Sequence, residues 1–179
     1  MMNNTQYLFE TGRLGFRNLI TEDAEEFYKL NSDYKVIQYT GDEEFANIKD
    51  AEDFLDSYNH YAKFGFGRWA VELKDSGEFL GWCGLKFNEE INKVDIGFRF
   101  FRKYWGRGFA TEAASASLEY GFNNYKLNEI IGRAQKANLA SIKVLEKIGM
   151  KFTGEFEDEE GTWVYLIIKH NEFKKLPLI

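Results

Sequence analysis

The stretch IGFRFFRKYWGRGFATEA, which runs from Ile96 to Ala113, decides the fold class. An apolar strand pattern ends within it, a turn containing Gly106 and Gly108 follows, and a helical pattern begins directly afterwards. The first backbone N–H groups of a helix have no partner within the helix, and the helix dipole makes that end positive. Glycine has no Cβ and lets an anion approach the backbone closely. The stretch therefore predicts a site for a phosphate-bearing ligand at the start of the helix.

The surroundings of the turn narrow this prediction. Arg102, Lys103 and Arg107 add positive charge there, in a chain whose net charge is −6. A Gly-x-Gly turn on its own is also consistent with an ordinary tight turn. The P-loop pattern Gly-x-x-x-x-Gly-Lys-Ser/Thr does not occur in the chain. The dinucleotide-binding pattern is excluded as well, because it needs a third glycine where this chain has Thr111 and a parallel unit before the turn.

Apolar periodicity in the rest of the chain predicts a single mixed α/β domain over residues 1–179, with a mostly antiparallel sheet flanked by helices. Three strands joined by short polar turns, which form an antiparallel meander, are expected at Arg68–Leu73, Phe79–Phe87 and Val94–Phe101. Gly81 and Gly84 allow a bulge in the second strand. The other predicted elements are helices from Thr21 and over 50–64, 110–123 and 138–148, and strands over 14–19, 129–134, 152–156 and 163–169.

Composition limits the class of ligand. The net charge of −6 disfavours nucleic acid, whose affinity for proteins comes largely from Lys and Arg. An acidic surface attracts cationic partners such as amines, although it is equally consistent with solubility alone. One cysteine and two histidines provide neither a disulfide framework nor a metal site. We see no signal peptide and no membrane-spanning apolar stretch, and therefore expect a cytoplasmic protein without a membrane partner.

Several motifs in order resemble those of the GNAT superfamily of N-acetyltransferases. The segment Tyr104–Ala113 resembles the acetyl-CoA signature of these enzymes, and Asn138–Met150 resembles their late helix beside the thioester. The segments Arg13–Arg17, Leu80–Leu85 and Val94–Phe98 are similar to the opening strand, the third strand and the strand that pairs with pantetheine. The resemblance covers nearly the whole chain and is strongest to the branch that contains the ribosomal-protein N-terminal acetyltransferases.

The resemblance implies acetyl-CoA, and no metal, as the co-substrate, with a role for each matching residue. The amides of Gly106–Ala110 would hold the pyrophosphate, and Phe98–Phe100 would bond pantetheine through the backbone, as an added strand does. Asn138 would bind the cofactor arm, with Ser141 nearby. The residues expected to bind the co-substrate are thus Phe98, Arg99, Phe100, Arg102, Lys103, Gly106, Arg107, Gly108, Phe109, Ala110, Thr111, Asn138 and Ser141.

Direct transfer of the acetyl group, as this family performs it, needs a proton acceptor for the amine and stabilisation of the oxyanion. Asp95, on the strand that the resemblance places at the co-substrate, is the candidate base, directly or through water. Ser141 is the candidate donor to the leaving thiolate. A strand-surface carboxylate and a helix-capping serine are the alternative interpretations. Leu145 stands where many family members carry a tyrosine general acid, so that role is unassigned.

The acceptor is the least constrained part of the prediction. Resemblance to one branch favours the α-amine of a protein or peptide N-terminus. A small amine such as a polyamine, an amino acid or an antibiotic is the first alternative, and a non-catalytic CoA-binding sensor is a second. Specificity should depend on the two early helices, their acidic link and the acidic segment Glu157–Gly161. A homodimer is possible.

Overall fold

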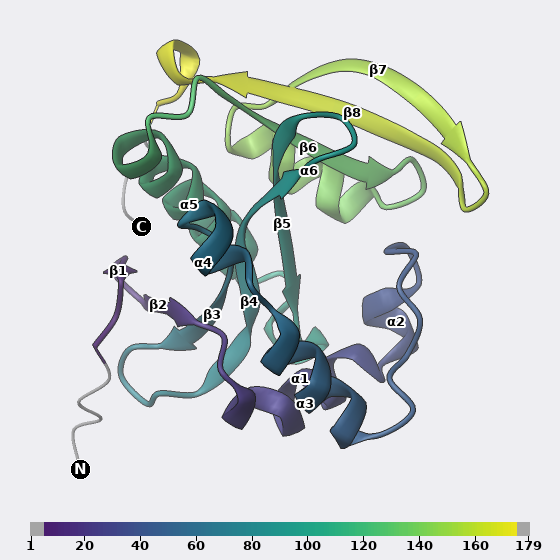
Figure 1. Cartoon of the computed structure of the whole chain (residues 1–179). Coiled ribbons are helices and arrows are strands. Elements are labelled where there is room, and N and C mark those ends of the chain that lie inside the picture. Colours follow the sequence, from purple (N-terminus) through teal and green to yellow (C-terminus); the bar gives the residue numbers. More distant parts are fainter. Residues whose placement is uncertain (1–5, 175–179) are drawn as a thin grey trace.

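The computed structural model describes residues 6–174, in which one eight-stranded sheet is flanked by helices (Figure 1). The strand order is β1-β2-β3-β4-β5-β6-β8-β7, and every pairing is antiparallel except that of β5 with β6. The strands are β1 (Phe9–Glu10), β2 (Leu14–Asn18), β3 (Arg68–Leu73), β4 (Phe79–Asn88), β5 (Lys93–Phe100), β6 (Glu129–Gln135), β7 (Lys151–Asp158) and β8 (Gly161–Lys169). The helices are α1 (Ala24–Asn31), α2 (Tyr34–Ile37), α3 (Ile48–Ser57), α4 (His60–Phe64), α5 (Phe109–Tyr125) and α6 (Leu139–Lys147), with short 3-10 turns at Thr21–Asp23, Arg102–Tyr104 and His170–Glu172. The predicted mixed α/β class and the meander β3-β4-β5 are confirmed.

Alternation along the strands divides the core between the two faces of the sheet. Trp69 and Val71 of β3 pack into the cluster that contains the buried face of α5, whereas Ala70 packs on the opposite side against α1 and α3. Successive strand side chains point to opposite faces, so both faces of the meander need a cover. The face under α1 and α3 also carries the polar side chains of the site described below.

The predicted bulge lies at Gly81 and not at Gly84. The pairing register of β3 with β4 shifts between Val71, opposite Gly81, and Glu72, opposite Phe79. Gly81 has φ +146°, and a Cβ there would overlap the backbone carbonyl of Arg99 on β5. The bulge therefore needs glycine both for its conformation and for the close approach of β5.

The predicted helix over 50–64 is wrong in one respect, because it is two helices. Helix α3 ends at Ser57, and Tyr58 is extended, with φ −72° and ψ 100°. The break allows the Tyr58 hydroxyl to accept a hydrogen bond from the Arg68 N–H at 2.8 Å, while the Tyr61 hydroxyl donates to the Arg68 carbonyl. Tertiary bonding to the start of β3 thus overrides the continuous helical pattern. The short elements β1 and α2 were not predicted.

The strands β1 to β5 form one half of the sheet and β6 to β8 the other, and the pairing that joins the two halves is very short. The parallel pairing of β5 with β6 comprises Asp95 opposite Ile131 and Ile96 opposite Gly132. Beyond Ile96 the two strands diverge, and the gap between them is visible in Figure 1. The segment from Gly97 to Phe100 is consequently paired with β4 on one side only. This divergence positions the site.

Candidate active site

The turn before α5 has the geometry of an anion-binding helix start. Gly106 and Gly108 adopt φ +72° and +81°, and residues 105–108 are exposed. The Glu112 N–H bonds the Gly108 carbonyl at 3.0 Å, so the amides of residues 109–111 precede the first intrahelical bond and point out of the helix end. A Cβ at Gly106 would meet no atom within 4 Å. The cradle is therefore open, and its donors fit a pyrophosphate group.

The predicted basic residues around this turn have different surroundings. Arg102 is paired with Asp33 at 2.5 Å and Lys103 with Glu78 at 2.8 Å. The Arg107 guanidinium lies 5.2 Å from the centre of the Phe109 ring. Of the three, Arg107 has no acidic partner among the described residues. It is therefore the one of the three that forms no direct ion pair, although the Glu78 carboxylate lies close enough to interact with it.

Arg13, which directly precedes β2, contacts this turn, and the sequence alone gave it no role there. Its guanidinium bonds the Arg107 carbonyl at 3.2 Å and forms an ion pair with Glu112 at 2.6 Å, while the Thr11 hydroxyl bonds the same carboxylate at 2.6 Å. Arg13 thereby ties the start of β2 to the turn and to the first turn of α5. Glu112, an acid near a helix start, is also favourably placed with respect to the helix dipole.

The segment of β5 without a β6 partner, residues 98–100, is the one that the family resemblance assigns to pantetheine. Residues 98–100 run beyond the last pairing with β6, which leaves their backbone groups on that side without a strand partner. The Phe100 carbonyl already accepts a hydrogen bond from the Trp105 indole nitrogen at 2.8 Å. Pairing of an extended ligand at Phe98 and Arg99 remains a prediction, and it would add a strand to an open sheet edge.

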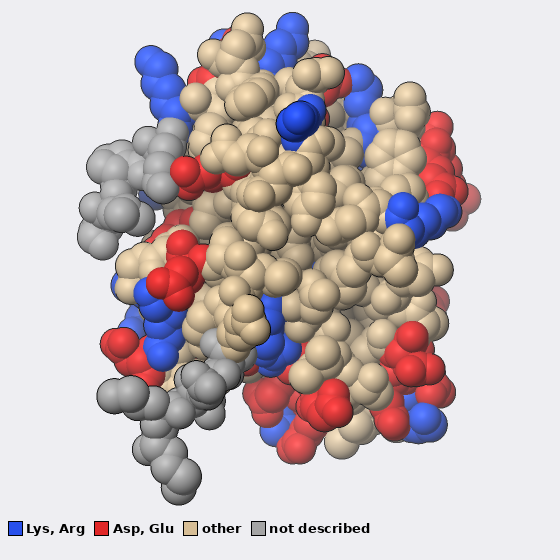
Figure 2. All heavy atoms as spheres, turned by 60° about the vertical axis from the view of Figure 1, so that its left-hand side comes forward, with Lys and Arg blue, Asp and Glu red and all other residues tan. Residues whose placement is uncertain are grey.

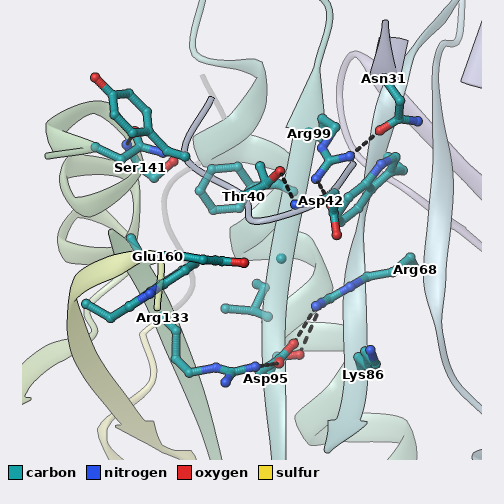
Figure 3. A pocket seen from close by; sticks show the side chains of 18 of the residues that line it. Asn31, Thr40, Asp42, Arg68, Lys86, Asp95, Arg99, Arg133, Ser141 and Glu160 are labelled. Carbon is teal, nitrogen blue, oxygen red and sulfur yellow. Dashed lines mark hydrogen bonds and ion pairs between the residues drawn. The ribbon is translucent and has the colours of Figure 1, made fainter. Parts of the chain in front are cut away.

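A pocket of about 620 Å³ opens on the α1/α3 face of the sheet, beside the divergence of the strands. Its walls come from the loop that follows α2 and from the tip of the β7–β8 hairpin (Figure 3). The Glu160 carboxylate at that tip lies against Gly41, since a Cβ at Gly41 would overlap it. The charged residues that line the pocket are Asp42, Glu43, Arg68, Lys86, Asp95, Arg99, Arg133, Asp158 and Glu160.

Asp95 lies at the floor of this pocket between two arginines (Figure 3). The Arg68 guanidinium bonds one carboxylate oxygen, Arg133 bonds the other at 3.0 Å, and Asp95 is 4% exposed. Burial acts to raise the pKa of Asp95, but the guanidinium groups of Arg68 and Arg133 outweigh it, so the pKa is lowered from its ordinary value of 3.8. A base that works near neutral pH needs a pKa raised toward that range, so these ion pairs favour an anchoring role over proton acceptance.

The start of α6 brings two further predicted residues to the pocket wall. Asn138 is the N-cap, and its side-chain oxygen accepts a hydrogen bond from the Ser141 N–H at 3.1 Å. Both residues line the pocket, and the capping bond leaves the Asn138 NH₂ group as a donor. Leu145, one turn further, is 2% exposed and contributes an apolar wall. Asn138, rather than Ser141, performs the capping, which keeps the Ser141 hydroxyl available to a ligand.

Arg99 was predicted to act through its backbone, but its side chain also belongs to the pocket. The side chain is buried, and its guanidinium bonds Asn31 of α1 and Asp42 of the loop after α2. Its guanidinium carbon lies 5.3 Å from the centre of the Trp82 ring, and that of Arg68 lies 5.4 Å from the same ring. Two cations therefore stack near one indole on the pocket floor.

The pocket residues that sequence reasoning missed are long-range partners. Arg68 and Arg133 lie on separate strands and meet only in the folded chain. One signal for Arg68 was present, because Gly97 is a glycine in a strand and a Cβ there would contact the Arg68 guanidinium. A strand glycine marks a close approach of another group. No comparable signal marks Arg133, whereas Asp42 belongs to the acidic link that the sequence had marked for specificity, without its pairing to Arg99.

An open helix start with unpaired amides beside a polar pocket is the arrangement that a group transferase with a phosphate-bearing donor needs. A family model described as "Acetyltransferase (GNAT) domain" matches residues 13–151. The chain belongs to the GNAT family, and it is an acetyl-CoA-dependent N-acetyltransferase.

Individual relatives agree with this assignment. The chain is 31% identical over 152 residues to a Bacillus licheniformis protein described as the uncharacterized N-acetyltransferase p20, covering 84% of this chain and 85% of that protein. A GNAT acetyltransferase from Bacillus anthracis has a TM-score of 0.80 and 29% identity, over 91% of this chain and 98% of that one. A Vibrio cholerae spermidine N-acetyltransferase, solved with CoA and spermine, has a TM-score of 0.77 over 89% of this chain and 96% of that one, and at 19% identity it supports the fold alone.

Among residues 6–174, none of the helices is both long enough and apolar enough to cross a membrane. On the face shown in Figure 2, Lys and Arg side chains are scattered among acids and do not gather into a stripe. The same part of the chain contains no group of histidine, cysteine and acidic side chains that could hold a metal ion.

Proposed function

We propose that this enzyme transfers the acetyl group of acetyl-CoA directly to the primary amine of a small molecule bound in the pocket. The observation that carries the proposal is the continuity of three features. These are the open helix start at Gly106–Ala110, the unpaired edge of β5, and the pocket beside the divergence of β5 from β6. A donor along the edge would have its reactive end beside the acceptor, which lowers the barrier through proximity and orientation.

The proposed donor site uses backbone groups more than side chains. The amides at the start of α5 bind the pyrophosphate, Arg107 adds positive charge beside it, and Arg13 holds the turn in shape. Backbone N–H groups fixed by a helix need no reorganisation when an anion binds. Acetyl-CoA, when bound, supplies a thioester whose carbonyl the amine attacks.

Two proton transfers accompany the acetyl transfer, one from the amine and one to the leaving thiolate. The amine loses its proton to water or to a carboxylate at the pocket mouth, and Asp95 contributes by holding Arg68 and Arg133 in place. Ser141 is proposed to donate to the leaving thiolate, whose modest basicity makes a strong acid unnecessary. Because a thiolate leaves readily without full protonation, we expect Ser141→Ala to lower kcat by about tenfold or less, even though Leu145 stands at the position of the family tyrosine.

The shape of the pocket supports a small acceptor over a protein N-terminus. The contact of Glu160 with Gly41 narrows the mouth between the two walls. The acids Glu43, Asp158 and Glu160 line the pocket and would attract a cationic amine. Small amines are also the acceptors named for some relatives. One is an Escherichia coli spermidine N(1)-acetyltransferase, 29% identical over 80% of this chain and 75% of that protein.

The test is release of free thiol from acetyl-CoA with two panels, one of small primary amines and one of short peptides with free N-termini. The proposal expects turnover with small amines and little with peptides. Turnover with peptides that requires their α-amine would contradict the proposed small acceptor and would identify a polypeptide N-terminus as the acceptor instead. No turnover in either panel, with acetyl-CoA binding intact, would contradict transfer to amines and favour a CoA-binding sensor.

A further inference from the structure

The buried side chain of Arg99 lines the pocket and is only partly paired there. Arg99 is 9% exposed, and its Nη1 bonds the side-chain oxygen of Asn31. Asn31 is itself 2% exposed and donates through Nδ2 to the Phe27 carbonyl at 2.6 Å, which fixes the orientation of its amide. One edge of the guanidinium is thus held rigidly by α1.

The other edge of the guanidinium is incompletely paired. Nη2 bonds a single oxygen of Asp42, whereas Nε is buried and has no hydrogen-bond partner in the described part of the chain. A carboxylate matches a guanidinium best when its two oxygens take two parallel N–H groups. Asp42 supplies only one such bond, so the preferred bidentate arrangement is unfilled. A buried unpaired donor is costly and calls for an explanation.

Asp42 is also a replaceable partner. Its side chain is 59% exposed, compared with 8% for that of Arg99, and it lies in a loop between α2 and α3 without regular structure. The Asp42 carboxylate is well solvated outside the ion pair, so Asp42 itself loses little when another carboxylate takes over its bond to Arg99. A carboxylate from a ligand could therefore take the place of Asp42 at small cost and also reach Nε.

The charges around Arg99 are arranged in two zones. Arg68, Arg99 and Arg133 on the floor outnumber Asp95, the buried acid between two of them. Glu43, Asp158 and Glu160 line the pocket from the two walls that form its mouth. An acceptor that carries both a negative and a positive group complements this pattern, since opposite potentials face each other on binding.

We infer that the acceptor is an amino carboxylic acid, whose carboxylate displaces Asp42 from Arg99 while its amine is acetylated. This inference rests on the proposed function and names its substrate class. Arg99 lies on β5 beyond its pairing with β6, so a small molecule anchored there stays beside the divergence of the strands. Asp42 then acts as an internal stand-in for the ligand carboxylate.

The first test compares the common L-amino acids with their carboxamides, which keep the amine and lose the negative charge. We expect kcat/KM for the best amino acid to exceed that of its carboxamide by about ten- to hundredfold, as for a hydrogen bond to a charged group. Equal rates within a pair, or a preference for the carboxamide, would overturn the inference and leave the proposed function intact. Absence of acetylation with every amine would instead contradict the proposed function.

A second test uses Asp42→Asn, with Glu43→Gln as the matched control. Both variants remove one negative charge from the same loop, but Asp42 is the one that bonds Arg99. We expect Asp42→Asn to lower KM for the amino acid by about two- to fivefold, because the internal competitor is weakened. Glu43→Gln should raise that KM, because it removes one of the acids that attract the amine. A rise in KM with Asp42→Asn, or equal changes for acid and carboxamide, would overturn the role given to Asp42.

Discussion

At the scale of single residues, Asp95 has the clearest energetic role. It is buried between Arg68 on β3 and Arg133 on β6, and so links the two halves of the sheet where their own pairing is shortest. Removing one partner of a buried ion pair costs about 3 kcal/mol or more, because the remaining charges lose their compensation. We expect Asp95→Asn to lower the free energy of unfolding by about that amount at pH 7, measured by urea denaturation.

The pH dependence of stability checks the same residue. The pKa of Asp95 is lowered in the folded state, so its contribution is fully present above the unfolded value near 4 and is lost as the pH falls through the lower folded value. Wild-type stability should therefore fall below about pH 4, and Asp95→Asn should show a shallower fall there. Parallel curves for the two proteins would contradict the ion-pair account.

Kinetics of the same variant separate anchoring from proton transfer. A direct base would lower kcat by roughly 10²–10⁴-fold when replaced and would remove the acidic limb of the kcat profile. For Asp95→Asn we expect a smaller loss of kcat and an unchanged acidic limb in the plot of kcat against pH. Both are measured at a temperature where the variant is folded. A missing limb would restore Asp95 as the base.

At the scale of elements, the bulge in β4 lets β5 approach closely. We expect Gly81→Ala to destabilise the protein by about 3 kcal/mol or more, since it adds both backbone strain and overlap with the Arg99 carbonyl. Gly154→Ala is the matched control, because a Cβ at Gly154 meets no atom within 4 Å. Thermal unfolding of both variants measures the difference, and similar midpoints would show that the bulge tolerates a side chain.

Sequence reasoning predicted these elements to different degrees. The meander and α5 were predictable because alternation and helical periodicity are local signals, as was the glycine turn at Gly106 and Gly108. The break at Tyr58 was not, because it depends on bonds to Arg68 on a later strand. The divergence of β5 from β6 and the pairing of Asp95 with two arginines are tertiary features for the same reason.

At the scale of the whole molecule, the co-substrate should stabilise the fold, because in the proposed site it bridges α5 and the open edge of β5. Acetyl-CoA at 100 times its Kd should raise the free energy of unfolding by about 2.7 kcal/mol. Gly108→Val should lose this gain, since φ +81° is unfavourable for a β-branched residue and its side chain would occupy the anion's place. A normal ligand-induced shift in this variant would refute the assigned pyrophosphate site.

Analysis of the products distinguishes direct acetyl transfer from acetyl-CoA to an amine in the pocket from every other outcome. The enzyme is mixed with acetyl-CoA and the best small-amine acceptor, and CoA, the N-acetylated amine and the protein mass are followed by mass spectrometry. For direct transfer we expect CoA and the N-acetylated amine in equal amounts, with no acetyl group left on the protein. Bound acetyl-CoA without any N-acetylated product, or an acetylated protein that forms first, would contradict it.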